Sequence, residues 1–132
     1  MPRAVWSHFN DRPRIQIEFQ LAANGQKVVC DLIADSGAGN KRSTIDLILD
    51  EHDCILYGGV ASTSALLGGA FTGTFPVYNI RVQVPPLGFN QLLRVVGVPA
   101  VPAGFDGIAS FRFLNRFTYG NFGDPDQFGV EM

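Results

Sequence analysis

The chain has 132 residues, of which 46% are hydrophobic and 17% charged, and its net charge at pH 7 is -2. This composition fits one packed domain and argues against a disordered segment. It holds no run of Lys and Arg with interleaved aromatic residues, which would indicate nucleic-acid binding, and no apolar run of the ~18 residues that suggest a membrane span. The first residues lack the apolar stretch of a signal peptide, so we expect a cytoplasmic protein without nucleic-acid or membrane partners.

The first part of the chain predicts a β-hairpin. We expect residues 1–12 to form an extended N-terminal arm. Residues 14–21 alternate apolar and polar side chains with a period of two, which is typical of a half-buried strand. The pair Asn24-Gly25 favours a hairpin turn, because both residues tolerate a positive φ. Residues 26–34 then supply the return strand.

The middle of the chain is less regular. We expect a loop at residues 35–42 and a charged turn at 50–53. Residues 43–49 fit a short strand or one helical turn, and we favour the strand. The apolar run at 54–60 favours another strand. Residues 61–74 are small and include several glycines, and the glycine pair at 68–69 is open to two interpretations, a flexible loop or the tip of a hairpin that covers a ligand.

The last part predicts two more strands and one helix. The strands are at residues 75–84 and 91–98, and a loop with proline and glycine follows at 99–104. Residues 108–117 place apolar side chains three positions apart, which predicts the one helix of the chain. The tail at 127–131 predicts a short strand without a nearby hairpin partner, so it could pair with another chain. These elements favour a mostly β fold, either a small barrel or a sandwich.

The segment from Asp35 to Ala38 carries the strongest chemical signal. Here an apolar strand breaks into a loop of small residues, which leaves a carboxylate at the rim of the core. Gly37 allows a backbone N–H group to approach that carboxylate closely. Two such carboxylates in contact share a proton, since like charges a few ångströms apart do not both ionise, and they become an acid and a base. The alternative is an ordinary Asx turn at a strand end, with Ser36 as a turn residue.

This segment resembles the Asp-Thr/Ser-Gly-Ala signature of the retropepsin-like aspartic proteases. Residues 104–114 resemble the late apolar-apolar-Gly segment that leads into the helix of that family. Residues 57–82 resemble its flap hairpin, with Leu67, Gly68 and Gly69 at the tip. The order and spacing of these three segments carry the resemblance, which spans residues 13–131.

The resemblance implies a single domain over residues 1–132: a small closed acid-protease-like barrel with one short C-terminal helix and a flap. It also implies an endopeptidase that hydrolyses extended peptides or unfolded proteins without a metal or a cofactor. Asp35 would be the catalytic residue, supported by Ser36, Gly37 and Ala38. The chain has one Asp-Ser-Gly, so a catalytic pair requires a homodimer. The tail at 127–131, together with the N-terminal arm, would supply strands between the two chains.

Three departures from the family pattern keep other interpretations open. Ser110 stands where the family usually has glycine. Phe111-Arg112 follows where Arg-Asn, or an apolar residue and Asp, is more usual in the family, so the usual ion pair with the aspartate loop is not expected in the same form. The segment Gly39–Arg42 is longer than the usual link to the next strand. One alternative is therefore a catalytically inactive retropepsin-like module for dimerisation or peptide binding. The other is a small β-barrel binding domain unrelated to proteases.

The remaining candidates have simpler explanations. Asp106 is expected to be a loop or cap residue. Cys30 and Cys54 each lie in an apolar run, which favours buried, reduced thiols. His8 and His52 do not combine with these cysteines into a zinc-binding pattern, so we expect no metal. Ser36 lacks the Gly-x-Ser-x-Gly elbow of a serine nucleophile.

Overall fold

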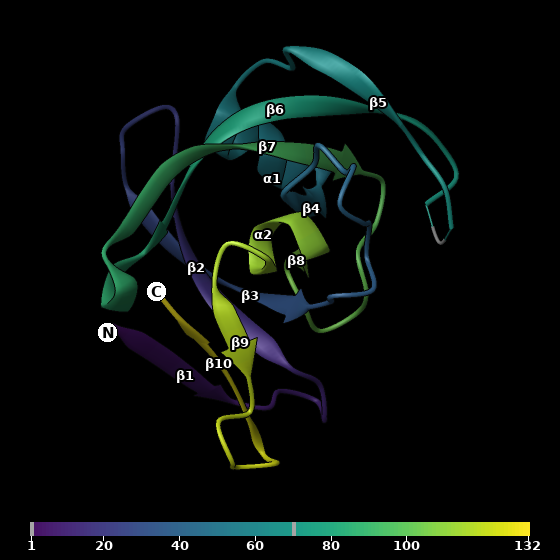
Figure 1. The fold of residues 1–132 in the computed structure, drawn as a ribbon. Coiled ribbons are helices and arrows are strands. Elements are labelled where there is room, and N and C mark those ends of the chain that lie inside the picture. The colour runs from purple at the N-terminus through teal and green to yellow at the C-terminus, as the bar shows by residue number, and fades with distance from the viewer. Residues whose placement is uncertain (1, 70) are drawn as a thin grey trace.

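The computed structural model describes residues 2–69 and 71–132 (Figure 1). Strands make up 49% and helices 12% of the structure, which confirms the mostly β fold. The helices are α1 (Glu51–Gly58), α2 (Phe111–Leu114) and a 3-10 turn, η1 (Pro85–Leu87). The strands are β1 (Arg3–Ser7), β2 (Arg14–Gln20), β3 (Lys27–Ala34), β4 (Leu47–Asp50), β5 (Thr63–Leu67), β6 (Gly73–Val84), β7 (Phe89–Val98), β8 (Gly107–Ala109), β9 (Thr118–Gly120) and β10 (Gln127–Glu131).

Six strands close into a barrel, as expected. Their order is β2-β3-β8-β4-β7-β6, and a pairing between Glu18 of β2 and Gln83 of β6 completes the ring. The predicted alternation of β2 gives the barrel an apolar interior, because Ile15, Ile17 and Phe19 all point into the core and are fully buried. The strand β5 extends the barrel sheet beyond β6, and a separate three-stranded sheet has the order β1-β10-β9 (Figure 1).

The short strand β8 lies between β3 and β4, which are consecutive strands in the sequence. It runs parallel to β3, with Ala109 beside Ala34, and antiparallel to β4. Gly107 permits this insertion, because a Cβ atom there would overlap the carbonyl oxygen of Ile48. As a result, the loop that follows β3 and the segment that follows β8 emerge side by side at one end of the barrel.

The predicted hairpin of β2 and β3 is present with shifted ends, and the two strands predicted at 75–84 and 91–98 form a second long hairpin, β6–β7. β2 pairs with β3 and β6 pairs with β7, each in the antiparallel sense. The turn near Asn24 is longer than the predicted two-residue turn: it spans residues 21–26, and only Gly25 has a positive φ there. The strand expected at 43–49 begins later, at Leu47.

The prediction of a strand at residues 54–60 is wrong, because residues 54–58 belong to helix α1. Asp50 caps the helix: its carboxylate accepts a hydrogen bond from the backbone N–H of His52 at 2.9 Å. The apolar run is not a buried strand, since Ile55 is 50% and Leu56 42% exposed. Only Cys54 of the helix is buried. The hairpin expected from residue 57 therefore starts later, at Thr63 of β5.

The helix predicted at residues 108–117 is much shorter than expected. Residues 107–109 form β8, and the helix α2 covers only Phe111–Leu114. The apolar spacing reflects two different environments. Ile108 belongs to a strand held between β3 and β4, whereas Phe113 and Phe117 pack edge to face within the main hydrophobic core.

The tail does form a strand, but its partners lie in the same chain. β10 pairs antiparallel with β1 on one side and with β9 on the other. Trp6 lies opposite Phe128, and Tyr119 opposite Val130. Both hydrogen-bonding edges of β10 are therefore occupied, and the expected pairing of this strand with a second copy is replaced by pairing within one copy.

Candidate active site

Asp35 lies immediately after β3, at the end of the barrel where β8 also ends. Its backbone N–H donates to the carbonyl oxygen of Ala109 at 3.0 Å, which continues the β3–β8 pairing by one residue. The chain then turns, because Ala38 donates back to the Asp35 carbonyl at 3.1 Å. The Asp35 side chain is half-buried and accepts a hydrogen bond from the Gly37 backbone N–H at 3.0 Å. A Cβ atom at residue 37 would lie 3.3 Å from that carboxylate oxygen, so glycine keeps the approach open.

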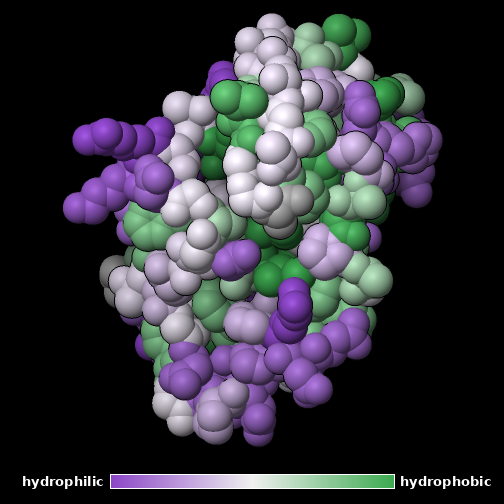
Figure 2. Space-filling view, turned by 90° about the vertical axis from the view of Figure 1, so that its right-hand side faces the viewer, coloured by the Kyte–Doolittle hydropathy of each residue, from purple (hydrophilic) through white to green (hydrophobic). Residues whose placement is uncertain are grey.

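A cavity of about 700 Å³ opens beside Asp35. One wall is the end of the β5–β6 hairpin, which reaches over from the far side of the barrel (Figure 1). The other wall is the loop between β3 and β4, and the floor includes Ile48 and Ile108. Figure 2 faces this side of the molecule and shows hydrophobic surface in the hollow beneath the hairpin, with hydrophilic residues around it. The size is that of a site for an extended peptide segment or a small ligand.

Most of the predicted site residues meet in this cavity. Asp35, Gly37 and Ala38 line it from the loop, and the predicted tip residues Leu67, Gly68 and Gly69 line it from the hairpin. These segments are more than 25 positions apart in the sequence, so the fold brings them together. Ser36 is the exception. It is exposed at the turn and does not line the cavity.

Ser110 follows β8 and is buried, with 4% of its surface exposed. Its hydroxyl lies 2.8 Å from the carbonyl oxygens of both Ile45 and Asp46, to which it can donate. Its backbone N–H also donates to the Asp46 carbonyl, at 3.1 Å. Ser110 therefore ties the start of α2 to the segment before β4, and its hydroxyl is engaged with that segment.

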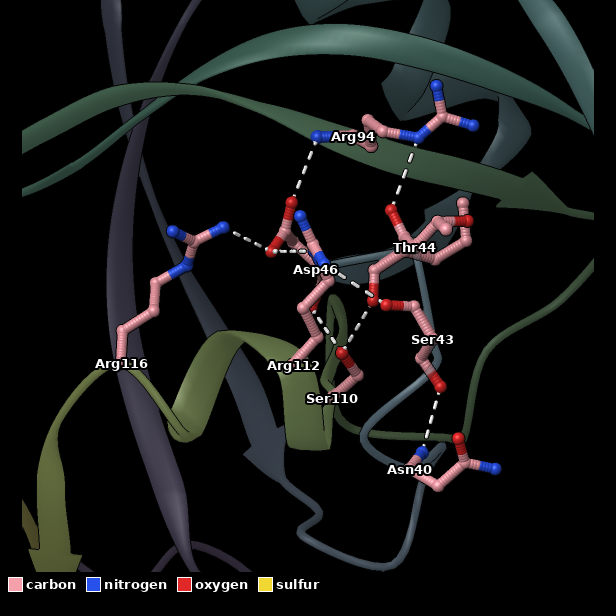
Figure 3. Close-up of polar contacts among 9 residues, drawn as sticks. Asn40, Ser43, Thr44, Asp46, Arg94, Ser110, Arg112 and Arg116 are labelled. Atoms are coloured by element: carbon pink, nitrogen blue, oxygen red, sulfur yellow. Dashed lines mark hydrogen bonds and ion pairs between the residues drawn. The ribbon is translucent and has the colours of Figure 1, made fainter.

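A cluster around Asp46, which the sequence analysis did not find, lies next to the cavity (Figure 3). Asp46 is 2% exposed. Its Oδ1 atom lies 2.6 Å from Nη2 of Arg116 and 3.3 Å from Nε of Arg112. Its Oδ2 atom accepts from the backbone N–H of Arg94 at 3.2 Å. This buried carboxylate thus joins α2, β7 and the start of β4, and it pairs with two cations.

The same cluster fixes the loop that lines the cavity. Arg112 donates from Nη1 to the carbonyl oxygen of Ser43 at 3.1 Å. The Ser43 hydroxyl accepts from the backbone N–H of Asn40 at 2.8 Å, and Ser43 donates its own N–H to the Asn40 carbonyl at 3.0 Å (Figure 3). Arg112 therefore does not pair with the Asp35 loop itself. It pairs with Asp46 and braces the longer segment that ends at Arg42.

Asp106 is a structural residue, as expected. Its Oδ2 atom accepts from the backbone N–H of Asp31 at 2.9 Å, and its own N–H donates to the Asp31 carbonyl at 2.9 Å. These two bonds attach the loop before β8 to the middle of β3. The Asp31 carboxylate is in turn paired with Arg14 of β2 at 3.1 Å. Asp106 thereby helps to set the register that brings β8 beside Asp35.

Neither thiol belongs to the cavity. Cys30 and Cys54 are both free and buried. Burial raises the pKa of Cys30 to about 11 and that of Cys54 to about 12, which keeps both thiols protonated and unreactive near neutral pH. The Cys30 sulfur lies 3.5 Å from the Tyr57 hydroxyl. Within residues 2–69 and 71–132, no three His, Cys, Asp or Glu side chains are grouped so that they could hold a metal ion.

Comparisons with family models, with curated proteins and with solved structures found no match to this chain. In the part of the chain that the structure describes, no helix is long and apolar enough to cross a membrane.

Proposed function

We propose that this chain is a homodimeric aspartic endopeptidase of the retropepsin-like type. One observation carries the proposal: Asp35 is the only carboxylate among the described residues that line the cavity beneath the β5–β6 hairpin. It comes at the end of an apolar strand, in a tight turn of small residues, and its carboxylate accepts one backbone hydrogen bond. A half-buried carboxylate in a mostly apolar cleft is suited to proton transfer.

A single carboxylate supplies one half of the chemistry. In the proposed dimer, Asp35 of the partner subunit lies against Asp35, and the two share one proton because they do not both ionise at close range. The ionised carboxylate removes a proton from a water molecule held between the two. The protonated one donates to the oxygen of the scissile carbonyl as the water attacks its carbon. The peptide bond is hydrolysed without a covalent intermediate and without a metal.

The exposure of the Asp35 turn supports contact with a second copy. Ser36 and Gly37 are both exposed and project from the end of the barrel. Because both edges of β10 are already paired, the proposed dimer is built on this turn and on the loops around it. The hydroxyl of Ser36, which does not line the cavity, is then free to contact the partner's turn.

The β5–β6 hairpin is the proposed flap. β5 is the terminal strand of the seven-stranded sheet, so its outer edge carries unpaired backbone groups that can bond to an extended peptide. Leu66 is largely exposed at the cavity, where it would cover the apolar side chains of a bound substrate. Closure of the hairpin would exclude water from the reacting bond.

The departures at Ser110 and Arg112 do not argue against catalysis. Both side chains bond to the segment before β4, at Asp46 and Ser43, and leave the carboxylate of Asp35 free. Asp35 thus stays the one carboxylate at the cavity, among the described residues, that is accessible to a water molecule beside a bound peptide. We therefore favour the hydrolase over the inactive module.

The test compares Asp35→Asn with the unchanged protein. Purified protein is incubated with an unfolded substrate protein over about pH 4 to 7, with and without a peptide inhibitor that carries a hydroxyl in place of the scissile carbonyl. We expect cleavage that the inhibitor blocks and that Asp35→Asn lowers by about a thousandfold. Asp126→Asn is the matched control. Asp126 is exposed and does not line the cavity, so this change should leave cleavage unchanged.

Two results would contradict the proposal in different ways. Cleavage that survives Asp35→Asn would rule out the carboxylate pair. A folded dimer that cleaves nothing at any pH would favour the inactive module instead. Sedimentation equilibrium of both variants supplies the dimer measurement, and a protein that stays monomeric at every concentration would exclude the pair as well.

A further inference from the structure

Arg42 has a distinctive place in the cavity wall. Among the described residues that line the cavity, it is the one cation, just as Asp35 is the one anion. The remaining lining is small, polar or apolar. Asp35 has a role in the proposed hydrolysis, whereas Arg42 has none in that chemistry.

The Arg42 side chain is also unengaged within the part of the chain that the structure describes. Three other arginines close to the cavity all have partners: Arg94 donates to the Thr44 carbonyl, and Arg112 and Arg116 pair with Asp46. No hydrogen bond or ion pair is formed by the Arg42 guanidinium with residues 2–69 or 71–132. A cation that is not needed by the fold is available to a ligand.

The backbone that carries Arg42 is held in place. Its N–H donates to the Asn40 side-chain oxygen at 2.8 Å, and the neighbouring Ser43 is bonded to both Asn40 and Arg112. The guanidinium thus projects from a braced loop, so less conformational freedom is lost when it binds. A planar guanidinium matches a carboxylate through two parallel N–H···O bonds.

We propose that Arg42 determines specificity by binding an acidic side chain of the peptide that occupies the cavity. This inference rests on the proposed function and names its substrate class: extended peptides with apolar side chains near the cleaved bond and one Glu or Asp at the position facing Arg42. The apolar subsites are formed by Ile45, Ile48 and Ile108 opposite Leu67 and Phe71. The peptide backbone pairs with the β5–β6 hairpin, and the side chains of the peptide contact the residues that line the cavity.

The test measures peptide binding and does not depend on turnover. Peptides with an apolar centre carry Glu at each flanking position in turn, and each has a partner with Gln there. Their dissociation constants are measured for Asp35→Asn, which holds peptides without cleaving them. At one position we expect Glu to bind about fivefold more tightly than Gln, an advantage that falls as salt is added. The second change Arg42→Gln should abolish it.

Lys41→Gln is the matched control, because Lys41 is the adjacent cation but lies outside this cavity. It should leave the Glu preference in place. The inference is overturned if no position prefers Glu, if the preference survives Arg42→Gln, if Lys41→Gln removes it equally, or if no peptide binds. The first three results leave the proposed hydrolase untouched. The fourth bears on it too, and the cleavage comparison made with Asp35 intact shows whether only the inference about Arg42 fails.

Discussion

The connection between β3 and β4 has a carboxylate at each end, and the two are treated in opposite ways by the fold. Asp35, at the start, is half-buried, and within the described chain its side chain accepts one hydrogen bond, from the adjacent turn. Asp46, at the end, is buried, pairs with two arginines and accepts a backbone N–H. One carboxylate keeps most of its hydrogen-bonding capacity open to the cavity, and the other uses its capacity in holding the loop.

This difference explains how a glycine-rich loop can carry a precise site. The Asp35 turn has little packing of its own, since Ser36 and Gly37 are exposed. It is held from outside: Ala109 and Phe111 bond to its backbone, and Phe111 begins the helix that Arg112 and Arg116 anchor to Asp46. The ion pairs at the Asp46 end hold the connection, and in the proposed hydrolase the Asp35 end supplies the reactive group.

The largest expected effect comes from exchanging each carboxylate for its amide. Asp46→Asn should lower the free energy of unfolding by about 2 to 3 kcal/mol, because it leaves two arginines without their anion. The figure is below that for a fully buried pair, since the side chains of Arg116 and Arg112 are 29% and 43% exposed and can reach water. Asp35→Asn should change the free energy of unfolding by less than about 0.5 kcal/mol. Urea unfolding measures both.

Equal losses from the two exchanges would contradict the comparison. Such a result would mean that Asp35 stabilises the fold as much as Asp46 does, so the two ends of the connection would not have different roles.

The location of the Asp35 turn at a strand end could be predicted from the sequence, because its signals are local. An apolar strand that breaks into Asp-Ser-Gly-Ala, and a later glycine pair at 68–69, are each visible within a few residues. The alternation at 14–21 and the strands at 75–84 and 91–98 likewise place the barrel. Closure of the barrel then brings the two site segments together.

The Asp46 end could not be predicted in the same way, because its partners are far apart in the chain. Arg94, Arg112 and Arg116 meet Asp46 only after β7, β8 and α2 have folded. One local signal was present: Asp46 stands alone inside the apolar run 45–49, where a carboxylate requires a cation. The partner could not be named from that run.

Helix α1 was missed because a short apolar run does not distinguish a strand from a helix. The sequence Cys54–Tyr57 is compatible with either. The deciding signal preceded it: Asp50 can cap a helix, and Glu51 and Asp53 suit the positive end of its dipole. These acids were interpreted as a charged turn.

A smaller effect is expected at Ser110, and it tests whether the support extends beyond the ion pairs. Ser110→Ala removes a buried hydroxyl that lies 2.8 Å from two carbonyl oxygens, so unfolding should become easier by about 1 to 1.5 kcal/mol. Ser62→Ala is the control, because that exposed hydroxyl bonds to a carbonyl at 3.3 Å and should contribute less than about 0.5 kcal/mol. Similar losses of unfolding free energy in both variants would show that the Ser110 hydroxyl contributes no more to stability than an exposed one.

The smallest effects on stability separate the two arginines of the cluster. Arg116 approaches Asp46 more closely than Arg112 does and is less exposed, so Arg116→Gln should cost about 1 kcal/mol and Arg112→Gln about half of that. Peptide binding should show the reverse order, because only Arg112 also bonds to Ser43 and braces the loop that carries Arg42. Urea unfolding and peptide dissociation constants, measured on both variants, provide the two rankings. If binding follows stability, the cluster acts on the fold as a whole; if the order reverses, Arg112 is the residue through which the buried end of the connection positions the cavity wall.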